Sequence, residues 1–447
     1  MRSSSCIAKC WASIWGKLPR NAISAIGPLL SSFVHLLLAL YLPSLKFRKI
    51  PTERDTEVID LFHKKCKALA VTDPIKFFFE FLYLFKGATN FKLTEFDLGN
   101  EIFMDASALF SFSGLSFRLS RKILDSAKEI SRKANVKILM NRDFLETIHN
   151  YFSGHWKEIK AFDDDLADEN LSLGEIWGAS QNLYWHGLPS IYQGSIDKAN
   201  YSINRLNDII EEYENDFSLI LKFELDTNLL LERRDLQNAL LAIEKAIELA
   251  NKAGFAIYLF DMYCYKVWIH ILMGDIEKAK KNLMHANEIR AEVNAVPIEL
   301  SNFCRSQLEY HLYRLKESIK SGNSSALSKY RKDAYKSSKM LIKVSKKAAQ
   351  HRTEAYKLMG VYYWLINKQK KALKSWQKAI EEGEGLGAQL ELSRTYFEIG
   401  KRLLEGGSKY KILNGLKAET YLEKANALFR EMDLQWDLDE LDRLVRS

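Results

Sequence analysis

The chain has 447 residues, a length that suggests two to four compact domains unless it is a repeat array that grows by stacking. Only 21 Gly and 7 Pro occur, and no run of β-branched residues alternates with polar ones, so we predict an almost wholly helical protein. The net charge is +8. The cysteines are odd in number and lack metal-ligand spacing, which argues against a disulfide framework or a zinc site and indicates a reducing, cytoplasmic compartment. They are Cys6, Cys10, Cys66, Cys264 and Cys304.

An apolar segment dominates the first part of the chain. Between Arg20 and Lys46 lie 25 residues without an acidic or basic side chain, a length that can cross a bilayer. Pro28 and His35 argue against a spanning helix, and a helix buried against the first repeats fits equally well. Basic residues flank both ends, so charge predicts no orientation. Residues 22–45 therefore have two interpretations, a membrane helix and a connecting helix.

One pattern recurs every forty residues through the middle of the chain. In each copy a turn residue precedes an alanine by five positions, and such a small residue lets the second helix of a pair approach the first. The three clear copies are Gly194 with Ala199, Arg234 with Ala239, and Gly274 with Ala279. Weaker copies begin at Gly154 and Gly114. Gly187, in the first helix of one copy, would permit close approach of the neighbouring helix.

The stretch that follows is strongly basic. We expect two helices in residues 296–350, broken at Ser321-Gly-Asn-Ser-Ser. Residues 329–378 contain fifteen Lys or Arg against only Asp333 and Glu354. Its first part, residues 329–352, could bind nucleic acid or anionic lipid. Because we expect the charges to fall on all sides of a helix, we interpret them as a solvated convex face.

The clearest repeat lies near the C-terminus. Its large, small, aromatic, turn and alanine positions match the tetratricopeptide repeat (TPR) pattern. They are Tyr356, Met359, Gly360, Tyr363, Asn367, Ala372, Trp376 and Ala379. A final helix pair is expected at residues 390–404 and 418–432, with 405–416 as an insertion. The predicted fold is all-α, a TPR-like α-solenoid of stacked antiparallel helix pairs.

These segments give a predicted domain organisation. It comprises an N-terminal apolar and basic segment (1–50), divergent entry helices and a first repeat (51–140), TPR-like repeats (141–295), a basic helical region (296–350) and C-terminal TPR repeats (351–447).

The forty-residue period and the closing segment 418–432 resemble the C-terminal helical region of large bacterial signalling ATPases. In that family an AAA-like or STAND ATPase module joins a protein kinase or nucleotide cyclase domain to a long TPR array. Thr72-Asp73-Pro74, followed by the aromatic segment 77–85, is similar to the entry into that array. The resemblance implies sensing or docking, with a signalling ATPase, kinase or cyclase as a partner.

The chain also departs from that family. No Gly-x-x-x-x-Gly-Lys-Ser/Thr phosphate loop occurs, so the catalytic residues of the family have no counterpart in this sequence. We expect either a free-standing scaffold or one component of a split signalling protein.

No other motif predicts catalysis, a cofactor or a metal. Glu146-x-x-His149 has the spacing of a di-iron ligand pair but lacks a second copy, so we expect a partly exposed histidine. The run Asp163-Asp164-Asp165 lacks the pattern of a calcium loop and is expected to be a solvated loop or a helix start. We predict no catalytic, cofactor-binding or metal site and no enzyme.

The geometry of TPR pairs points to side chains that would line a concave groove, where aromatic and cationic groups could bind a peptide or helix. These are Tyr184, Tyr192, Trp268, Lys357 and Trp364. The predicted function is a non-enzymatic protein-interaction scaffold or sensor in bacterial signal transduction. The alternatives are a membrane-anchored signalling component held by residues 22–45 and, less favoured, a nucleic-acid-binding regulator.

Overall fold

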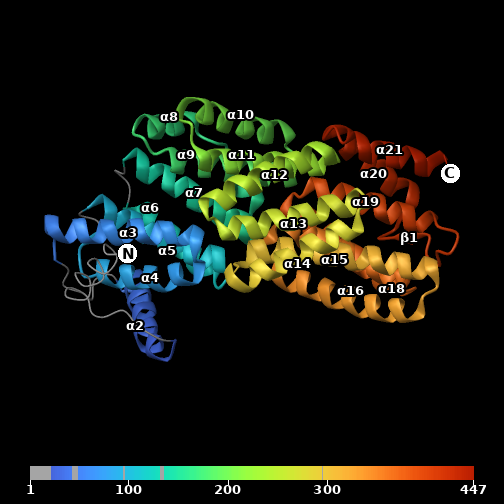
Figure 1. Ribbon diagram of the computed structural model, residues 1–447, viewed down its shortest axis with the longest axis horizontal. Helices are drawn as coiled ribbons and strands as arrows, with labels where there is room; N and C mark the ends of the chain where they lie inside the picture. The colour runs from blue at the N-terminus through green and yellow to red at the C-terminus, as the bar shows by residue number, and fades with distance from the viewer. Residues whose placement is uncertain (1–21, 43–48, 94–95, 131–134, 294, 447) are drawn as a thin grey trace. The chain divides into compact units, whose positions relative to one another are not determined.

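The computed structural model describes residues 22–42, 49–93, 96–130, 135–293 and 295–446, and within them the chain is an all-α helical array (Figure 1). It divides into two compact units. Unit 1 holds the described residues up to His149 together with Asp163–Gly178, and unit 2 holds Asn150–Phe162 and the described residues from Ala179 on. Cys6, Cys10 and the first part of segment 1–50 lie outside the described residues.

Unit 1 is a bundle whose helix starts are set by local hydrogen bonds. Thr52 and Asp55 form a capping box, with Asp55 N donating to Thr52 Oγ1 at 3.3 Å. Asp73 caps the next helix and Pro74 occupies its first turn, where no donor is lost. Its helices are α2 (Ala22–Tyr41), α3 (Glu53–Thr72), α4 (Pro74–Ala88), α5 (Asp97–Ser113), α6 (Phe117–Ile130), α7 (Val136–Ser153, which runs into unit 2) and α8 (Asp164–Ser172).

Helix α2 contains most of the apolar segment and packs within unit 1. Leu36 and Leu40 are buried in the core that α3, α4 and α5 share. Lys86 Nζ, on α4, donates to Ser31 Oγ at 2.9 Å. Among the described helices, none combines the length and the hydropathy that a bilayer crossing requires.

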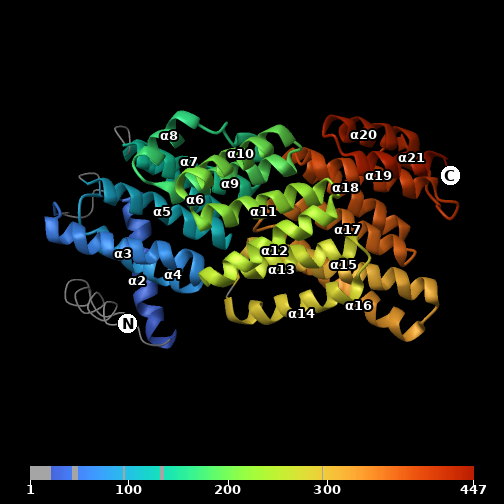
Figure 2. The same ribbon diagram turned by 45° about the horizontal axis from the view of Figure 1, so that its top comes forward.

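Unit 2 consists of successive helix pairs (Figures 1 and 2). The first helices of the pairs are α9 (Ile176–Tyr192, which begins in unit 1), α11 (Asp216–Glu232), α13 (Ala256–Leu272), α15 (Pro297–Ser321), α17 (Arg352–Leu365) and α19 (Gln389–Leu404). The second helices are α10 (Ile196–Tyr213), α12 (Leu236–Ala253), α14 (Ile276–Val293), α16 (Ser324–Ser345), α18 (Gln369–Leu386) and α20 (Ala418–Glu431). Short 3₁₀ turns lie at η3 (Trp156–Glu158) and η4 (Ala349–His351), and α21 (Gln435–Arg446) ends the unit.

The turn within each pair explains the forty-residue marker. Gly194 and Gly274 have φ of 76° and 78°, in the left-handed region that glycine adopts without strain. Arg234 and Asn367 occupy the same kind of turn with φ of 63° and 57°. The alanines that follow these turns are fully buried. A larger side chain at these positions would hold the two helices of the pair apart. They are Ala199, Ala239, Ala279 and Ala372.

Two helical glycines lie where helices approach closely. A Cβ at Gly187 would lie 2.6 Å from Leu225 Cδ2. At Gly360 a Cβ would clash with the indole of Trp376, which is fully buried and donates from Nε1 to Lys357 O at 3.1 Å. Ala379, one turn beyond Trp376, is also fully buried.

Two interruptions between helices of unit 2 have clear local causes. Gly322, at φ 66°, ends α15, and the Asn323 side chain accepts a hydrogen bond from Ala326 N at 3.0 Å to begin α16. The insertion after α19 contains an antiparallel hairpin of β1 (Ile412–Leu413) and β2 (Leu416–Lys417), which the sequence reading did not predict. Its Asn414-Gly415 turn has positive φ at both residues, the conformation that closes two-residue hairpins.

Replacing Gly360 with alanine should destabilise the protein by about 1–3 kcal/mol, because the added methyl group must displace the buried indole. Gly385 is a matched control: it lies in α18 with no atom near the position of a Cβ, so Gly385→Ala should stabilise by up to about 1 kcal/mol. Chemical denaturation of both variants measures this. Equal stability of the two variants would contradict the close contact.

Candidate functional site

Charged side chains in the interior of unit 2 follow a strict division between the helices. Among the described residues of this unit, every buried Asp, Glu and Arg lies on a first helix or on α21, and none lies on a second helix. We call this set the inner face: Glu224, Glu232, Asp261, Arg305, Glu354, Glu391, Arg394 and Asp437. Burying a charge is costly unless it is paired and hydrogen-bonded, so the contacts of these groups decide what the face can do.

Arg394, on α19, connects helices that are far apart in the sequence. Its Nε and Nη2 donate to the two carboxylate oxygens of Asp437 at 3.2 and 2.9 Å. Nη2 also donates to Glu232 O at 2.6 Å, and Nη1 pairs with the carboxylate of Glu232. Helices α11, α19 and α21 therefore meet at one guanidinium.

A second network joins α15 to α17. Arg305 Nε donates to Glu354 Oε2 at 2.7 Å, and His351 Nδ1 lies 3.0 Å from the same oxygen. Although burial opposes it, the charge of Arg305 and the hydrogen bond from His351 hold the pKa of Glu354 well below its usual value. The Arg305 guanidinium also lies 3.0 Å from the ring centroid of Trp268. These contacts compensate the charges of Arg305 and Glu354.

Three carboxyl groups on successive first helices are less well compensated. Burial, followed by the nearby charge of Asp261, raises the pKa of Glu224 to about 8. Burial also raises the pKa of Asp261 to about 7 and that of Glu299 well above its usual value. Tyr184 Oη donates to Glu224 Oε1 at 2.6 Å, and Asn302 Nδ2 donates to Asp261 Oδ1 at 2.6 Å. We call Glu224, Asp261 and Glu299 the acidic row.

Two atoms of the acidic row lack a donor. Oε2 of Glu224 and Oε2 of Glu299 are buried, and no described residue donates a hydrogen bond to either. Buried polar atoms in native proteins are nearly always hydrogen-bonded, so an exception calls for an explanation such as a water molecule or a ligand. The acidic row therefore has the capacity to accept hydrogen bonds from a cationic or N–H-bearing group.

The five groove residues expected from the sequence are not exposed. Tyr184 donates a hydrogen bond to Glu224 of the acidic row, and the Trp268 ring lies against the guanidinium of Arg305. Tyr192 lies edge-on to His351 with ring centroids 6.2 Å apart, and Lys357 Nζ pairs with Glu391 at 2.6 Å. Trp364 lies apart from these, with its ring tilted against that of Trp376 and its Nε1 donating to Glu405 at 2.7 Å. Four of the five thus contribute to the inner face, and all five are largely buried in this structure.

Sequence reasoning missed the acidic row and the two arginines that carry most of the buried charge. A signal was present: Glu224, Asp261 and Glu299 recur at intervals of 37 and 38 residues, and each lies within a first helix. These intervals are shorter than the forty-residue period, so each acid lies about one turn earlier in its helix than the one before. An acidic residue within each of three successive first helices indicates a specific role.

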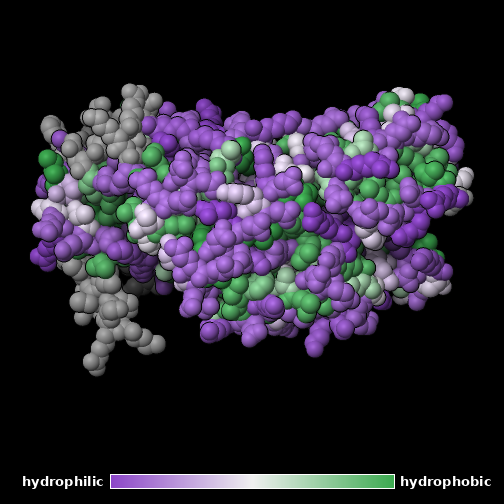
Figure 3. All heavy atoms as spheres, turned by 90° about the horizontal axis from the view of Figure 1, so that it is seen from above, coloured by the Kyte–Doolittle hydropathy of each residue, from purple (hydrophilic) through white to green (hydrophobic). Residues whose placement is uncertain are grey.

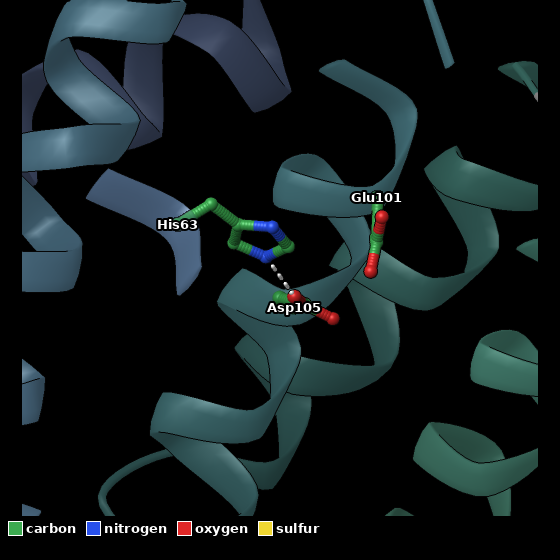
Figure 4. A group of neighbouring side chains, drawn as sticks. All are labelled: His63, Glu101 and Asp105. Carbon is green, nitrogen blue, oxygen red and sulfur yellow. Dashed lines mark hydrogen bonds and ion pairs between the residues drawn. The ribbon is translucent and has the colours of Figure 1, made fainter. Parts of the chain in front are cut away.

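Unit 1 holds a separate group of polar side chains (Figure 4). His63 Nε2, from α3, lies 2.7 Å from Asp105 Oδ2 on α5, and Glu101 lies one turn earlier on α5. Their ligand atoms are close enough to hold a metal ion. However, the ammonium of Lys67 pairs with Glu101, and Asn141 Nδ2 donates to Asp105 Oδ1 at 2.8 Å. The protein therefore supplies its own cation and donors here, and we assign no metal site.

The two remaining candidates from the sequence are also placed in unit 1. His149 was expected to be partly exposed, but it is buried, with Nδ1 3.0 Å from Ser120 Oγ, because α7 packs this side inward against α6. Glu146 pairs with Lys128 at 3.0 Å. Asp163 caps α8, accepting from Leu166 N at 3.0 Å, so the acidic run begins a helix.

No family model matches the sequence, and no curated protein matches it. Among solved structures, the chain is similar to a Rap protein complexed with competence and sporulation factor, at 12% identity, over 78% of this chain and 97% of that one, with a TM-score of 0.48. It is also similar to a circular tandem repeat protein, at 12% identity, over 94% and 98% of the two chains, with a TM-score of 0.19. The assignment of a helical array rests on the helix pairs of this chain.

Removing the guanidinium of Arg394 should be strongly destabilising. Arg394→Leu leaves Glu232 and Asp437 buried without a cation, and we expect a loss of about 3–5 kcal/mol in unfolding free energy. Arg443 on α21 is exposed and pairs only locally with Glu440, so Arg443→Leu should change stability by less than about 1 kcal/mol. Urea denaturation compares the two, and a similar small loss in both would contradict the role of Arg394.

The raised pKa of Glu224 predicts a pH-dependent stability. Its folded pKa of about 8 exceeds the usual 4.5, so folding favours the neutral form, and this stabilisation is lost as pH rises through about 8. Glu224→Gln imitates the neutral form at every pH. The melting temperature of the variant minus that of the original protein should therefore rise between about pH 6 and about pH 9. The difference for Glu212→Gln, an exposed site on α10, should stay constant. A flat difference for Glu224→Gln would contradict the assignment.

Proposed function

We propose that the chain is a non-enzymatic protein-interaction scaffold, and that the inner face of unit 2 binds a segment of its partner. The observation that carries this proposal is the confinement of the buried charges to the first helices and α21. A helical stack held together by apolar packing alone needs no carboxylates in its interior, and burying them costs free energy. Their presence on successive first helices is explained if they serve a common, extended ligand.

The chemistry of the acidic row suggests what kind of segment binds. The free oxygens of Glu224 and Glu299 accept hydrogen bonds and cannot donate them when ionised. A lysine or arginine side chain, a free amino terminus or backbone N–H groups of an extended peptide would supply the missing donors. We therefore propose a peptide segment with at least one cationic group as the ligand.

Entry of such a segment requires the first helices to separate. Each pair of a repeat array contacts mainly its neighbours, so small rotations between pairs can widen the inner face without unfolding any helix. The contacts of Arg394 hold this face closed in the present structure. The proposed mechanism is burial of the segment, with hydrogen bonds and ion pairs exchanged and no covalent step.

The wider setting of the scaffold follows from the family resemblance of the sequence. We propose a role in bacterial signal transduction, with a signalling ATPase, kinase or cyclase as the protein that carries the bound segment. In this proposal the apolar helix α2 serves as a structural element of unit 1.

Selection from a random peptide library displayed on its encoding RNA, with the immobilised full chain as target, tests the peptide proposal. Enriched peptides should carry Lys, Arg or a free amino terminus. Their affinity should fall about 10–100-fold for Glu224→Gln, because a cationic group that contacts Glu224 favours its ionised form, and Gln cannot ionise. Glu212→Gln serves as the matched control and should bind as the original protein does.

Two outcomes would overturn this proposal. The first is that no peptide is enriched above an unrelated helical protein. The second is that the enriched peptides bind Glu224→Gln as tightly as Glu212→Gln, which would place the binding surface elsewhere.

A further inference from the structure

Helix α16 carries its lysines on one face. From Lys329 to Lys346 they follow one another at intervals of three and four residues, the spacing that keeps side chains on one side of a helix. We call this set the lysine face: Lys329, Lys332, Lys336, Lys339, Lys343, Lys346 and Lys347, the last two directly after the helix end. All seven are exposed, while Ala334, Ser338 and Leu341 on the opposite side are fully buried. The expectation that the charges fall on all sides of a helix is therefore wrong.

The lysine face is not neutralised by the protein. Within the part of the chain that the structure describes, no carboxylate forms an ion pair with any of its seven lysines. Of the two acidic residues in segment 329–378, Glu354 is buried against Arg305 and Asp333 lies on α16 itself. Glu382 on α18 lines a pocket with Lys346, but it pairs with Arg352. On α14, by contrast, Lys278 pairs with Asp275 at 2.8 Å. The charge of the lysine face is thus available to an external anion.

The neighbouring second helix adds to the same charge. Lys370, Lys371, Lys374 and Lys378 on α18 are exposed, and no described carboxylate pairs with them. Both α16 and α18 are second helices, and Figure 2 shows α16 at the lower edge of unit 2. The basic surface therefore lies on helices that carry none of the inner-face residues.

We propose that the lysine face docks unit 2 onto an anionic lipid surface. The five lysines within α16 span about 21 Å of helix at 1.5 Å per residue, so they form a straight row that a flat surface of negative headgroups can meet along its whole length. Lysine presents a compact point charge on a flexible stem, which suits attraction to a charged surface without fixed geometry. This inference is independent of the proposed function of the inner face.

Exposed apolar side chains beside the row favour lipid over nucleic acid. Met340 is 49% exposed and Tyr335 is 39% exposed. At a bilayer such side chains enter the headgroup region beside the lysines. Duplex nucleic acid is commonly held by arginine forks, but Arg331 lies off the row and is hydrogen-bonded to Tyr362. Stacking of single-stranded bases needs open aromatic faces, whereas Lys339 Nζ lies 5.9 Å from the Tyr335 ring centroid.

Co-sedimentation of the full chain with vesicles tests this inference. One set of vesicles is phosphatidylcholine alone, and in the other about a third of the lipid is phosphatidylserine. The test variant replaces four lysines of the lysine face: Lys332→Gln, Lys336→Gln, Lys339→Gln and Lys343→Gln. The control variant removes the same charge from exposed lysines elsewhere in unit 2: Lys198→Gln, Lys280→Gln, Lys281→Gln and Lys411→Gln. Circular dichroism melting establishes that both variants fold.

The original protein and the control variant should bind the phosphatidylserine vesicles and dissociate at high salt. The test variant should lose several hundredfold, about 600-fold, in partitioning, since each of the four lysines near an anionic surface contributes about fivefold. Three results would each overturn the inference: equal binding of the two variants, no preference for phosphatidylserine, or no binding at all. Binding of a duplex DNA that depends on the same four lysines, without vesicle binding, would reassign the surface to nucleic acid.

Discussion

The guanidinium of Arg394 is the contact on which the closure of unit 2 depends. It is buried and lies between Glu232 on α11 and Asp437 on α21, residues that are distant in the sequence. A buried arginine without carboxylate partners would be very unfavourable, and the same holds for the two carboxylates without the arginine. The three helices must therefore come together for any of these charges to be buried. Packing between neighbouring helix pairs forms the array, and the contacts of Arg394 bring α11 together with α19 and α21.

The inner and outer sides of unit 2 differ in how their charges are compensated. On the inner face, arginines and carboxylates pair with one another, while Glu224 and Glu299 of the acidic row keep buried oxygens without donors. On the outer side, the lysine face has no acidic partners among the described residues. Hydrophilic residues also cover most of the molecular face seen in Figure 3, with apolar residues in separate patches. Electrostatics and hydrogen bonding, more than an open apolar groove, thus distinguish the surfaces that we propose to bind partners.

Several misreadings of the sequence share one physical cause. Helical periodicity indicates which side of a helix is apolar, but it does not indicate whether a polar side chain on that side meets a partner from a distant helix. Arg394 could not be recognised as buried because its partners come from other repeats. Glu224 lies within an apolar first helix, a visible signal, but its partner Tyr184 comes from the preceding repeat. His149 was expected at the surface because its partner Ser120 comes from the preceding helix. The lysine face has a different cause: the three- and four-residue spacing of its lysines already indicates one side of a helix.

The sequence by itself determined the helical repeat, because its signals are local. The small residues Gly360 and Ala372, the left-handed turns and the cap at Asn323 act within one helix pair, so their spacing alone predicts the pairs. The hairpin at Asn414-Gly415 could also have been predicted from its turn. Only the tertiary structure decided which polar side chains are buried, since that depends on how far the array curves back on itself. The expected groove residues Tyr184 and Trp268 are therefore part of a closed, hydrogen-bonded interior, in which the acidic row retains its two oxygens without donors.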